Sequence, residues 1–380
     1  MLFIVAPDSF KGSLSAVEAT HYMERGIKAV FPQAVVKKVP LADGGEGTVE
    51  AIINAAGGRL LEAEVTGPLG RPVKAVYGVL SDGITGVLEV ASVCGLPQVP
   101  PERRNPESTT SLGVGELILA AVAEGCRRVI VGLGGSATND GGIGMAAALG
   151  IRFPDGTGRP LEPRVSNLAQ ATGIDYSGLD QRLAGVEVTG IYDVSSPLYG
   201  PRGASVVFGP QKGATPEQVQ RLDTLLRRLA ELIRQTYGIK VDDLPGAGAA
   251  GGLGAGLAAF LGGRLVPGSD MLLELCKLDE FITENEVDLV ITGEGEINHQ
   301  TVLGKVPVSV ARLAKKHNLP VVALVGSIGP GYTEVYQHGI NAVYGIIPRP
   351  MELSEAMQNA AVLLEEATVR LMRLWRLGCD

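Results

Sequence analysis

The stretch RVIVGLGGSATNDGGIGMAAALG, residues 128–150, indicates most clearly how this chain folds. It opens with the apolar run 129–131, which is typical of a buried parallel strand, and a helix begins at Met145. A polar loop rich in glycine joins the two. A strand, a glycine-rich loop and a helix in this order direct backbone N–H groups and a helix N-terminus toward an anion. The stretch therefore predicts an α/β fold with an anion site where this strand ends.

Asp140 is the unusual residue of this loop, because a carboxylate repels a phosphate group. It suits the loop if it holds a metal ion or accepts a proton. In the alternative interpretation the loop is a tight turn, and Asp140 caps the helix that follows. The residues alone leave both interpretations open.

The composition excludes several classes of protein. A chain of 380 residues with 45% hydrophobic residues is long enough for about two to three domains with a large core. The net charge of −8 and the scattered arginine clusters argue against nucleic acid or an anionic membrane as partner. The four cysteines form no CxxC pair, which favours a reducing cytoplasm and disfavours a zinc site. We expect neither a signal peptide nor a membrane-spanning segment.

Hydrophobic patterns predict regular alternation of strands and helices near both ends of the chain. The expected strands are 2–6, 34–39, 60–65, 73–80, 85–90, 129–131, 186–192, 288–292, 321–325 and 341–346, and a short strand with a turn is expected over 151–158. The expected helices are 16–30, 48–56, 110–124, 145–149, 216–237, 306–317 and 352–374. Two alternating runs around residues 67–70 predict a hairpin, which we interpret as the start of a second domain. The simplest architecture is an open α/β domain formed by both termini, with another domain inserted in it.

Polar motifs occur along the chain in one order. They are APDSFKGSLSA (6–16), PLADGGEGT (40–48), RNPESTTS (104–111), GGSATNDGG (134–142), GPQKGAT (209–215), PGAGAAGGLGA (245–255), and TGEG with LGK (292–295 and 303–305). Together they closely resemble the motifs of the type-1 glycerate kinase family, and the similarity spans nearly the whole chain. The resemblance implies a flavodoxin- or Rossmann-like open parallel sheet formed by residues 1–66 and 286–380. A mixed α/β domain, residues 67–285, would be inserted in it, with the active site in the cleft between the domains.

The resemblance also implies an activity. The family transfers the γ-phosphoryl group of ATP to D-glycerate, so we expect ATP and Mg²⁺ as co-substrate and cofactor. The product expected here is 2-phosphoglycerate rather than 3-phosphoglycerate. We further expect a cytoplasmic enzyme, either a monomer or a homodimer, that binds neither nucleic acid nor membranes.

Phosphoryl transfer requires neutralisation of phosphate charge, a divalent metal and an oriented hydroxyl group. The chain has no GxxxxGK[ST] motif, so glycine-loop amides and loop lysines are expected to hold the phosphates. Lys11 is expected to act in catalysis. The residues predicted to bind ATP or phosphate are Gly134, Gly135, Ser136, Asn139, Lys212, Gly293, Gly295 and Lys305.

Several carboxylates follow strands or lie in glycine loops, where helix capping is the alternative role. Asp193 or Asp43 is expected to accept the hydroxyl proton, and Asp140 or Glu294 to contact the metal. The guanidinium of Arg104 offers a bidentate fork for the carboxylate of glycerate. The residues predicted to bind the substrate are Asp8, Ser9, Arg104, Asn105, Thr109 and Thr110. The alternative for the two threonines is a plain helix cap.

Two loops depart from the family pattern and suggest a second hypothesis. The family usually has Asp and Asn where this chain has Ser195 and Ser196, and Arg and Asp where it has Glu296 and Asn298. The chain could therefore be a family member of altered or lost activity that acts on another small hydroxy acid or sugar acid.

A third hypothesis is an NAD(P)-dependent oxidoreductase that uses residues 246–251 as a GxGxxG motif, with Asp270 near the ribose. The absence of a predicted strand before this motif argues against it.

Overall fold

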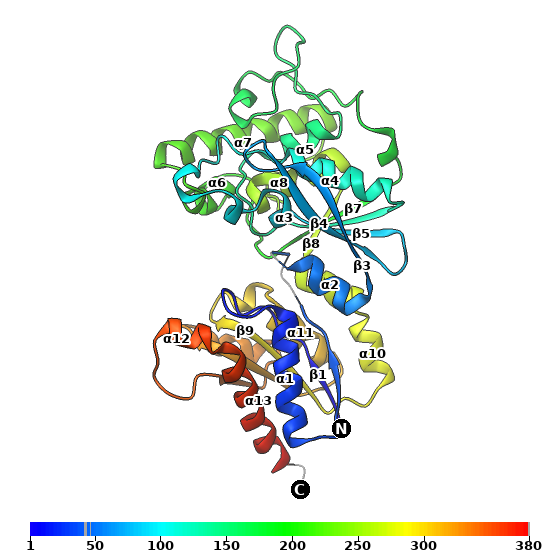
Figure 1. Ribbon diagram of the computed structural model, residues 1–380. Helices are drawn as coiled ribbons and strands as arrows, with labels where there is room; N and C mark the ends of the chain where they lie inside the picture. Colours follow the sequence, from blue (N-terminus) through cyan, green and yellow to red (C-terminus); the bar gives the residue numbers. More distant parts are fainter. Residues whose placement is uncertain (42–43, 46, 379–380) are drawn as a thin grey trace. The chain divides into compact units, whose positions relative to one another are not determined.

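The chain forms two compact units in a computed structural model that describes residues 1–41, 44–45 and 47–378 (Figure 1). The terminal unit comprises Met1–Asp43, Asn54–Ala56 and Ser269–Asp380, and the central unit comprises Gly44–Ile53 and Gly57–Gly268. The family motifs imply domain limits at 66 and 286 instead. The chain leaves the terminal unit earlier than that, because residues 58–66 pair with the sheet of the central unit.

The terminal unit is built on a parallel sheet with the strand order β11–β10–β9–β1–β2. Its strands are β1 (Leu2–Val5), β2 (Val35–Lys38), β9 (Leu289–Ile297), β10 (Val321–Ile328) and β11 (Ala342–Gly345). Strands from the two ends of the chain are therefore direct neighbours. The carboxyl ends of β1 and β9 meet at one edge, which places their following loops together.

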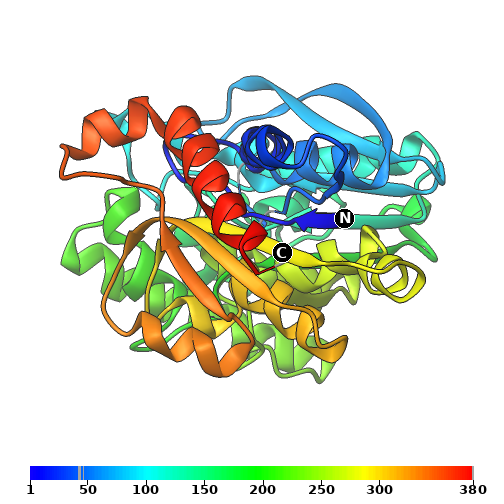
Figure 2. The same cartoon turned by 90° about the horizontal axis from the view of Figure 1, so that it is seen from below.

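Helices cover both faces of this sheet (Figure 2). On one face, α1 (Ala16–Val30) and α13 (Ala360–Arg376) pack side by side over apolar side chains such as Phe3. On the other face, α11 (Val306–Lys316) packs against β9 and β10. A capping box of Ser15 and Glu18 starts α1, as the sequence predicts. The remaining helices of this unit are α9 (Gly268–Leu275), α10 (Leu278–Glu284) and α12 (Leu353–Gln358).

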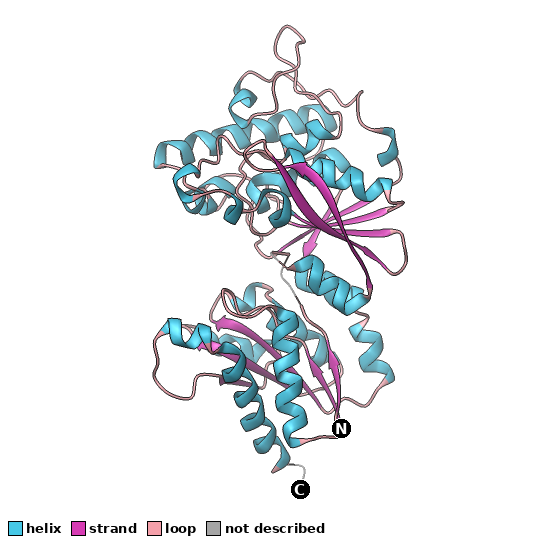
Figure 3. Ribbon diagram, in the orientation of Figure 1, coloured by secondary structure: helices cyan, strands magenta, loops and turns pink. Residues whose placement is uncertain are grey.

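The central unit contains a mixed sheet with the order β3–β4–β5–β6–β7–β8 (Figure 3). Its strands are β3 (Gly58–Thr66), β4 (Pro72–Leu80), β5 (Thr85–Glu89), β6 (Arg128–Gly132), β7 (Glu187–Tyr192) and β8 (Arg264–Pro267). The first two strands form the predicted antiparallel hairpin, whereas β5 to β8 are parallel. The quoted stretch 128–150 thus begins with an inner strand of this sheet.

One large apolar core joins this sheet to its helices. These helices are α3 (Val90–Cys94), α4 (Leu112–Ala123), α5 (Ile143–Ala148), α6 (Ala204–Phe208), α7 (Pro216–Tyr237) and α8 (Ala249–Leu261). The helix α2 (Thr48–Ala56) precedes β3. Short 3-10 turns are η1 (Leu96–Gln98), η2 (Pro101–Arg103), η3 (Val165–Ala169), η4 (Gln181–Leu183), η5 (Pro210–Lys212), η6 (Thr301–Leu303) and η7 (Tyr332–His338). None of the helices that the structure describes has the length and apolar character needed to cross a bilayer.

The fold class predicted from the sequence is confirmed, but β8, α3, α6, α8, α9 and α10 were not predicted, and two predicted elements differ. The single helix predicted over 352–374 is broken at Asn359, whose Nδ2 donates to the Glu355 carbonyl oxygen at 2.8 Å. Residues 151–158 form isolated bridges rather than a strand. One of these bridges joins Pro154 to Pro160, and proline has no N–H group to extend a ladder.

Candidate active site

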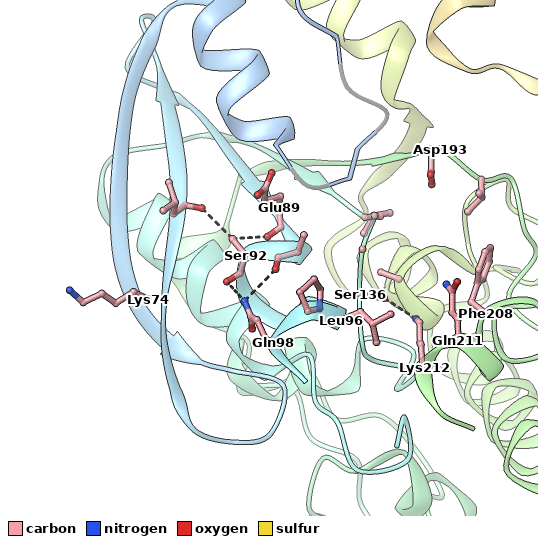
Figure 4. A pocket seen from close by; sticks show the side chains of 18 residues that line it. Lys74, Glu89, Ser92, Leu96, Gln98, Ser136, Asp193, Phe208, Gln211 and Lys212 are labelled. Carbon is pink, nitrogen blue, oxygen red and sulfur yellow. Dashed lines mark hydrogen bonds between the residues drawn. The ribbon is translucent and has the colours of Figure 1, made fainter. Parts of the chain in front are cut away.

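The central unit holds a cavity of about 670 Å³ beside the loop that follows β6 (Figure 4). We call it the central cavity. Among its lining residues are Gly134, Gly135, Ser136, Asp193 and Lys212, which were all predicted as site residues. They come from three separate loops of the chain. Figure 4 shows Asp193 on the same side of the cavity as Lys212, Phe208 and Gln211.

Lys212 is enclosed in the wall of the central cavity, with 4% of its surface exposed. Its Nζ donates to the Thr138 carbonyl oxygen at 2.7 Å and to Ser136 Oγ at 2.9 Å. Burial lowers the pKa of Lys212 to about 8, while Cys94 and Asp140 act in the opposite direction. Both of the described hydrogen-bond acceptors of Nζ are neutral oxygens. This cation is therefore held by neutral acceptors next to a cavity, a setting that favours an anionic ligand.

Glycines give the two loops beside Lys212 their shape. After Lys212 the chain turns at Gly213 with φ of +90°, where a side chain would collide with the Arg104 carbonyl oxygen. The turn at Gly134 packs directly against Gly44 and Gly45, and Gly134 N donates to the Gly44 carbonyl oxygen at 2.8 Å. The backbone at Gly134 therefore packs directly against the backbone of Gly44 and Gly45, and a Cβ atom at Gly134 would collide with it.

Asp140 lies inside the central unit and does not line the cavity. Its Oδ2 accepts from Ser111 N at 2.9 Å and from Ser111 Oγ at 2.8 Å, and its Oδ1 accepts from Gly142 N at 3.1 Å. Burial raises the pKa of Asp140, and these hydrogen bonds lower it. The carboxylate thus satisfies backbone groups at the starts of α4 and α5. Of the two interpretations that the sequence left open, this geometry favours the cap.

The terminal unit holds a second cavity, of about 430 Å³, at the edge where β1, β9 and β10 end. We call it the terminal cavity. Its polar lining includes the predicted site residues Asp8, Ser9, Lys11, Glu294, Gly295 and Lys305. Asp8 is buried and its Oδ1 accepts from Ser9 N at 2.6 Å, whereas Lys11 is exposed. The other lining residues of this cavity are mostly aliphatic.

Glu294 is, like Asp8, an enclosed carboxylate of the terminal cavity, with 4% of its surface exposed. Its Oε1 accepts from Thr301 Oγ1 at 2.7 Å, and Oε2 lies 3.4 Å from Lys305 Nζ. Burial raises the pKa of Glu294, and the charge of Lys305 lowers it. Glu294 is therefore a carboxylate at the cavity wall, and its Oε2 has one distant cationic partner.

Comparison with known proteins identifies the family. The sequence model described as the Glycerate kinase family matches residues 3–376 of the chain. The chain belongs to the glycerate kinase family.

Relatives of similar length support this family membership. The chain is 48% identical over 365 residues to "Glycerate kinase" of Bacillus subtilis, covering 96% of this chain and 95% of the relative. It is 46% identical over 360 residues to "Glycerate 2-kinase" of Escherichia coli, covering 95% and 94%. A crystal structure of a protein designated glycerate kinase 2 from Salmonella typhimurium LT2 superposes with a TM-score of 0.86 at 44% identity, covering 100% of this chain and 99% of that one. The resemblance stated from the motifs is confirmed.

Not all residues predicted from the glycerate kinase motifs reach a cavity wall. Arg104 Nε lies 3.4 Å from the Val99 carbonyl oxygen, and Asn105 Oδ1 accepts from Gln218 Nε2 at 3.1 Å. Thr109 Oγ1 donates to the Ala137 carbonyl oxygen at 3.0 Å, and Thr110 Oγ1 accepts from Leu112 N at 3.2 Å. These four residues line neither the central nor the terminal cavity. Asn105 lines a third cavity beside α7, and Thr109 and Thr110 lie just before α4.

Three further predictions concern residues away from the cavity walls or outside the described chain. Asn139 is buried, and its Nδ2 donates to Ser205 Oγ at 3.0 Å, while its Oδ1 has no partner among the described atoms. Gly293 lies within β9, where its carbonyl oxygen accepts from Asp8 N at 2.8 Å. Asp43, the alternative base, lies outside the described residues.

The glycine stretch proposed for a dinucleotide packs against protein instead. No strand is present among residues 238–248, which precede it. Gly251 accepts a hydrogen bond from Gly141 N at 3.0 Å, and a side chain at Gly251 would collide with the Thr138 carbonyl oxygen. The stretch therefore supports the loop that carries Ser136 and Thr138.

Sequence reasoning missed part of both cavities. In the central cavity it missed Glu89, which ends β5 and whose Oε2 accepts from Val49 N at 3.2 Å. The position of Glu89 at the carboxyl end of a predicted parallel strand was a usable signal. It also missed the aliphatic wall of the terminal cavity, whose residues look like ordinary core in the sequence.

Proposed function

We propose that this chain is an ATP-dependent kinase that transfers the γ-phosphoryl group of ATP to a hydroxyl group of D-glycerate. Family membership and the names of the relatives support this proposal. The observation that carries it is the enclosed Lys212 at the wall of the central cavity, beside the Gly134–Gly135 turn and with Asp193 in the same lining. A cation and a carboxylate in the lining of one cavity suit phosphoryl transfer.

Each of these groups has a proposed task. Lys212 neutralises the phosphoryl group, and it does so strongly because burial shields it from water. Asp193 orients the glycerate hydroxyl group and accepts its proton, with Asp43 as the alternative. The hydroxyl O–H bond breaks and its oxygen bonds to the γ-phosphorus. The bond from that phosphorus to the bridging oxygen of ADP breaks, and ADP leaves.

Mg²⁺ is expected to accompany ATP, and the two carboxylates predicted to contact it differ in how well they could hold the ion. Asp140 does not suit the ion, because Ser111 and Gly142 already occupy both of its oxygens. Glu294 suits it better, because it lines the terminal cavity and its Oε2 has only Lys305 at 3.4 Å. No cluster of three potential metal ligands occurs among the described residues. One carboxylate is enough when phosphate oxygens and waters complete the shell of Mg²⁺.

The finer points of the proposal rest on the relatives and on the sequence. We propose that the 2-hydroxyl group is phosphorylated, which the name "Glycerate 2-kinase" of the Escherichia coli relative supports. A cytoplasmic monomer or homodimer remains our expectation for the protein in the cell.

A coupled assay of ADP release with ATP, Mg²⁺ and D-glycerate tests this function. We expect turnover that requires D-glycerate, and NMR of the product should show 2-phosphoglycerate. Turnover with 3-phosphoglycerate as product would correct the position of transfer. Absence of turnover with purified, folded protein that still binds ATP would overturn the proposal and favour another hydroxy acid or sugar acid as substrate.

A further inference from the structure

The terminal cavity lies at a point of the sheet where ligands often bind. From β1 the chain continues through α1 to β2 on one side, and from β9 it continues through α11 to β10 on the other. The order therefore reverses between the neighbouring strands β1 and β9. In open parallel sheets such a switch point leaves a crevice beyond the carboxyl ends of the strands. Asp8, Lys11 and Glu294, which follow or end these two strands, line the cavity.

One end of this cavity is polar and carries two lysines. Lys11 comes from the loop after β1, and Lys305 immediately precedes α11. The N-terminus of α11 thus lies beside Lys305, which adds a partial positive charge to the same end. Lys305 Nζ is 3.4 Å from Glu294 Oε2, a loose contact that leaves the ammonium group able to bind other acceptors. The carboxylates of Asp8, Glu294 and Glu296 line the same cavity, so its polar part suits a polyphosphate that arrives with a divalent cation.

Another part of the lining is aliphatic and includes Ile346, Ile347, Leu353, Met357, Ala360 and Leu363. It comes from the residues after β11, from α12 and from the start of α13. At the rim, Leu353 is 73% exposed and Ile347 is 38% exposed. Met357 contacts the loop that carries Lys11, because a Cβ atom placed on Gly12 would lie 2.7 Å from the Cε atom of Met357. The aliphatic wall and the lysine end are therefore parts of one site.

The two substrates of the proposed reaction, glycerate and ATP, would gain different amounts of binding energy from contact with this aliphatic wall. Every carbon of glycerate carries an oxygen, so contact with an aliphatic wall would contribute little to its binding. A nucleobase has two apolar faces that gain from contact with aliphatic side chains. The cavity volume of about 430 Å³ is within the usual range for small-molecule sites.

We propose that the terminal cavity binds the nucleotide, with the base on the Ile347–Leu353 wall and the phosphates toward Lys11 and Lys305. This inference rests on the proposed function for the identity of the nucleotide, and it goes further by assigning the base to one unit. The exposed side chains of Ile347 and Leu353 are then the surface that the base covers. The polar central cavity is left for glycerate and the phosphoryl group.

A binding experiment on the full chain tests this assignment. The variant Ile347→Ser/Leu353→Ser removes the rim of the wall, and Val362→Ser/Leu374→Ser is the matched control. Val362 and Leu374 are 56% and 62% exposed residues of α13 that do not line the cavity. Titration calorimetry should show ADP binding weakened about tenfold or more in the first variant and unchanged in the control. Binding of inorganic tripolyphosphate, which has no base, should be equal in both variants.

Kinetics separate this inference from the proposed function. The rim variant should raise the KM for ATP and leave the KM for D-glycerate unchanged. ADP binding as tight in the rim variant as in the control, or no ADP binding by the wild type, would overturn the assignment even if the enzyme phosphorylates glycerate. If the wild type fails to phosphorylate glycerate but the ADP result holds, the proposed function falls and the nucleotide site stands.

Discussion

Lys212 in the central cavity is enclosed, whereas Lys11 in the terminal cavity is exposed and the side chain of Lys305 is 29% exposed. The enclosed lysine loses its water when the chain folds, so an anion that reaches it meets a poorly screened charge. The exposed lysines keep much of their water, and each contributes little to binding. The terminal cavity has an aliphatic wall in addition. The comparison indicates that charge acts mainly in the central cavity and apolar contact mainly in the terminal one.

The strongest way to test the role of the central cavity is to remove its carboxylate. Asp193→Asn keeps the shape of the side chain but cannot accept a proton, so we expect kcat to fall by about 10²- to 10⁴-fold with little change in the KM for ATP. Steady-state kinetics with D-glycerate measures this. Asp175→Asn is the control, because Asp175 is a surface residue of the same unit whose Oδ1 accepts from Ser177 N at 2.9 Å. A wild-type kcat in Asp193→Asn would transfer the role of base to Asp43.

The next test compares two lysines that line the same cavity. Lys212→Met removes the enclosed cation, and we expect kcat/KM for ATP to fall by about 10²- to 10³-fold. Lys74→Met is the matched control, since Figure 4 shows Lys74 pointing away from Ser136 and Lys212. If kcat/KM for ATP falls by the same factor in both variants, the enclosure of Lys212 has no special effect. Thermal unfolding should accompany the assay, because Lys212 also holds Ser136 and Thr138.

A smaller effect is expected from pH. Because the pKa of Lys212 is lowered to about 8, the free enzyme loses this charge above pH 8, and kcat/KM for ATP should then fall by up to tenfold per pH unit. Asp140 and Cys94 face Lys212, but burial keeps the pKa of Cys94 at about 12, far above this range. Burial raises the pKa of Asp140 as well, and its hydrogen bonds from Ser111 oppose that rise. In Lys212→Met the fall above pH 8 should be absent.

The lowered pKa of Lys212 affects stability in the opposite direction from activity. In the unfolded chain lysine keeps its proton to about pH 10.5, so between pH 8 and 10.5 the unfolded state binds more protons than the folded state. The contribution of Lys212 to stability therefore rises with pH in that window. Denaturant titrations of the wild type and Lys212→Met at pH 7.5 and 9.5 should show the difference.

The smallest effect is expected in the terminal cavity, where Asn298 Nδ2 donates to Glu296 Oε1 at 2.6 Å. Asn298→Asp alone places two carboxylates side by side, so kcat/KM for ATP should fall severalfold. The double variant Glu296→Arg/Asn298→Asp restores an opposite pair and should return to within about threefold of the wild type. If this variant or Ser195→Asp instead raises turnover more than tenfold, the natural chain is an attenuated enzyme, as the second hypothesis states.

The sequence predicts well what depends on neighbouring residues. The strand at Val129–Val131, the capping box of Ser15 and the hairpin around residues 67–70 follow from local patterns, and all are present. The role of Asp140 depends on Ser111, 29 residues earlier, and no local rule distinguishes a cap from a metal ligand there. Thr109 is likewise held by Ala137. The aliphatic wall could not be predicted, because it forms only where β11, α12 and α13 meet.

The packing of Gly134 on Gly45, and of Gly251 on the Thr138 carbonyl, has a consequence for redesign of this enzyme. Backbone fills the space at these positions, so a new substrate preference cannot be introduced through side chains there. Ile347 and Leu353 have open surroundings and stand at the rim of a cavity. A library that seeks altered cosubstrate choice should therefore diversify these two rim positions and leave the glycine loops as they are.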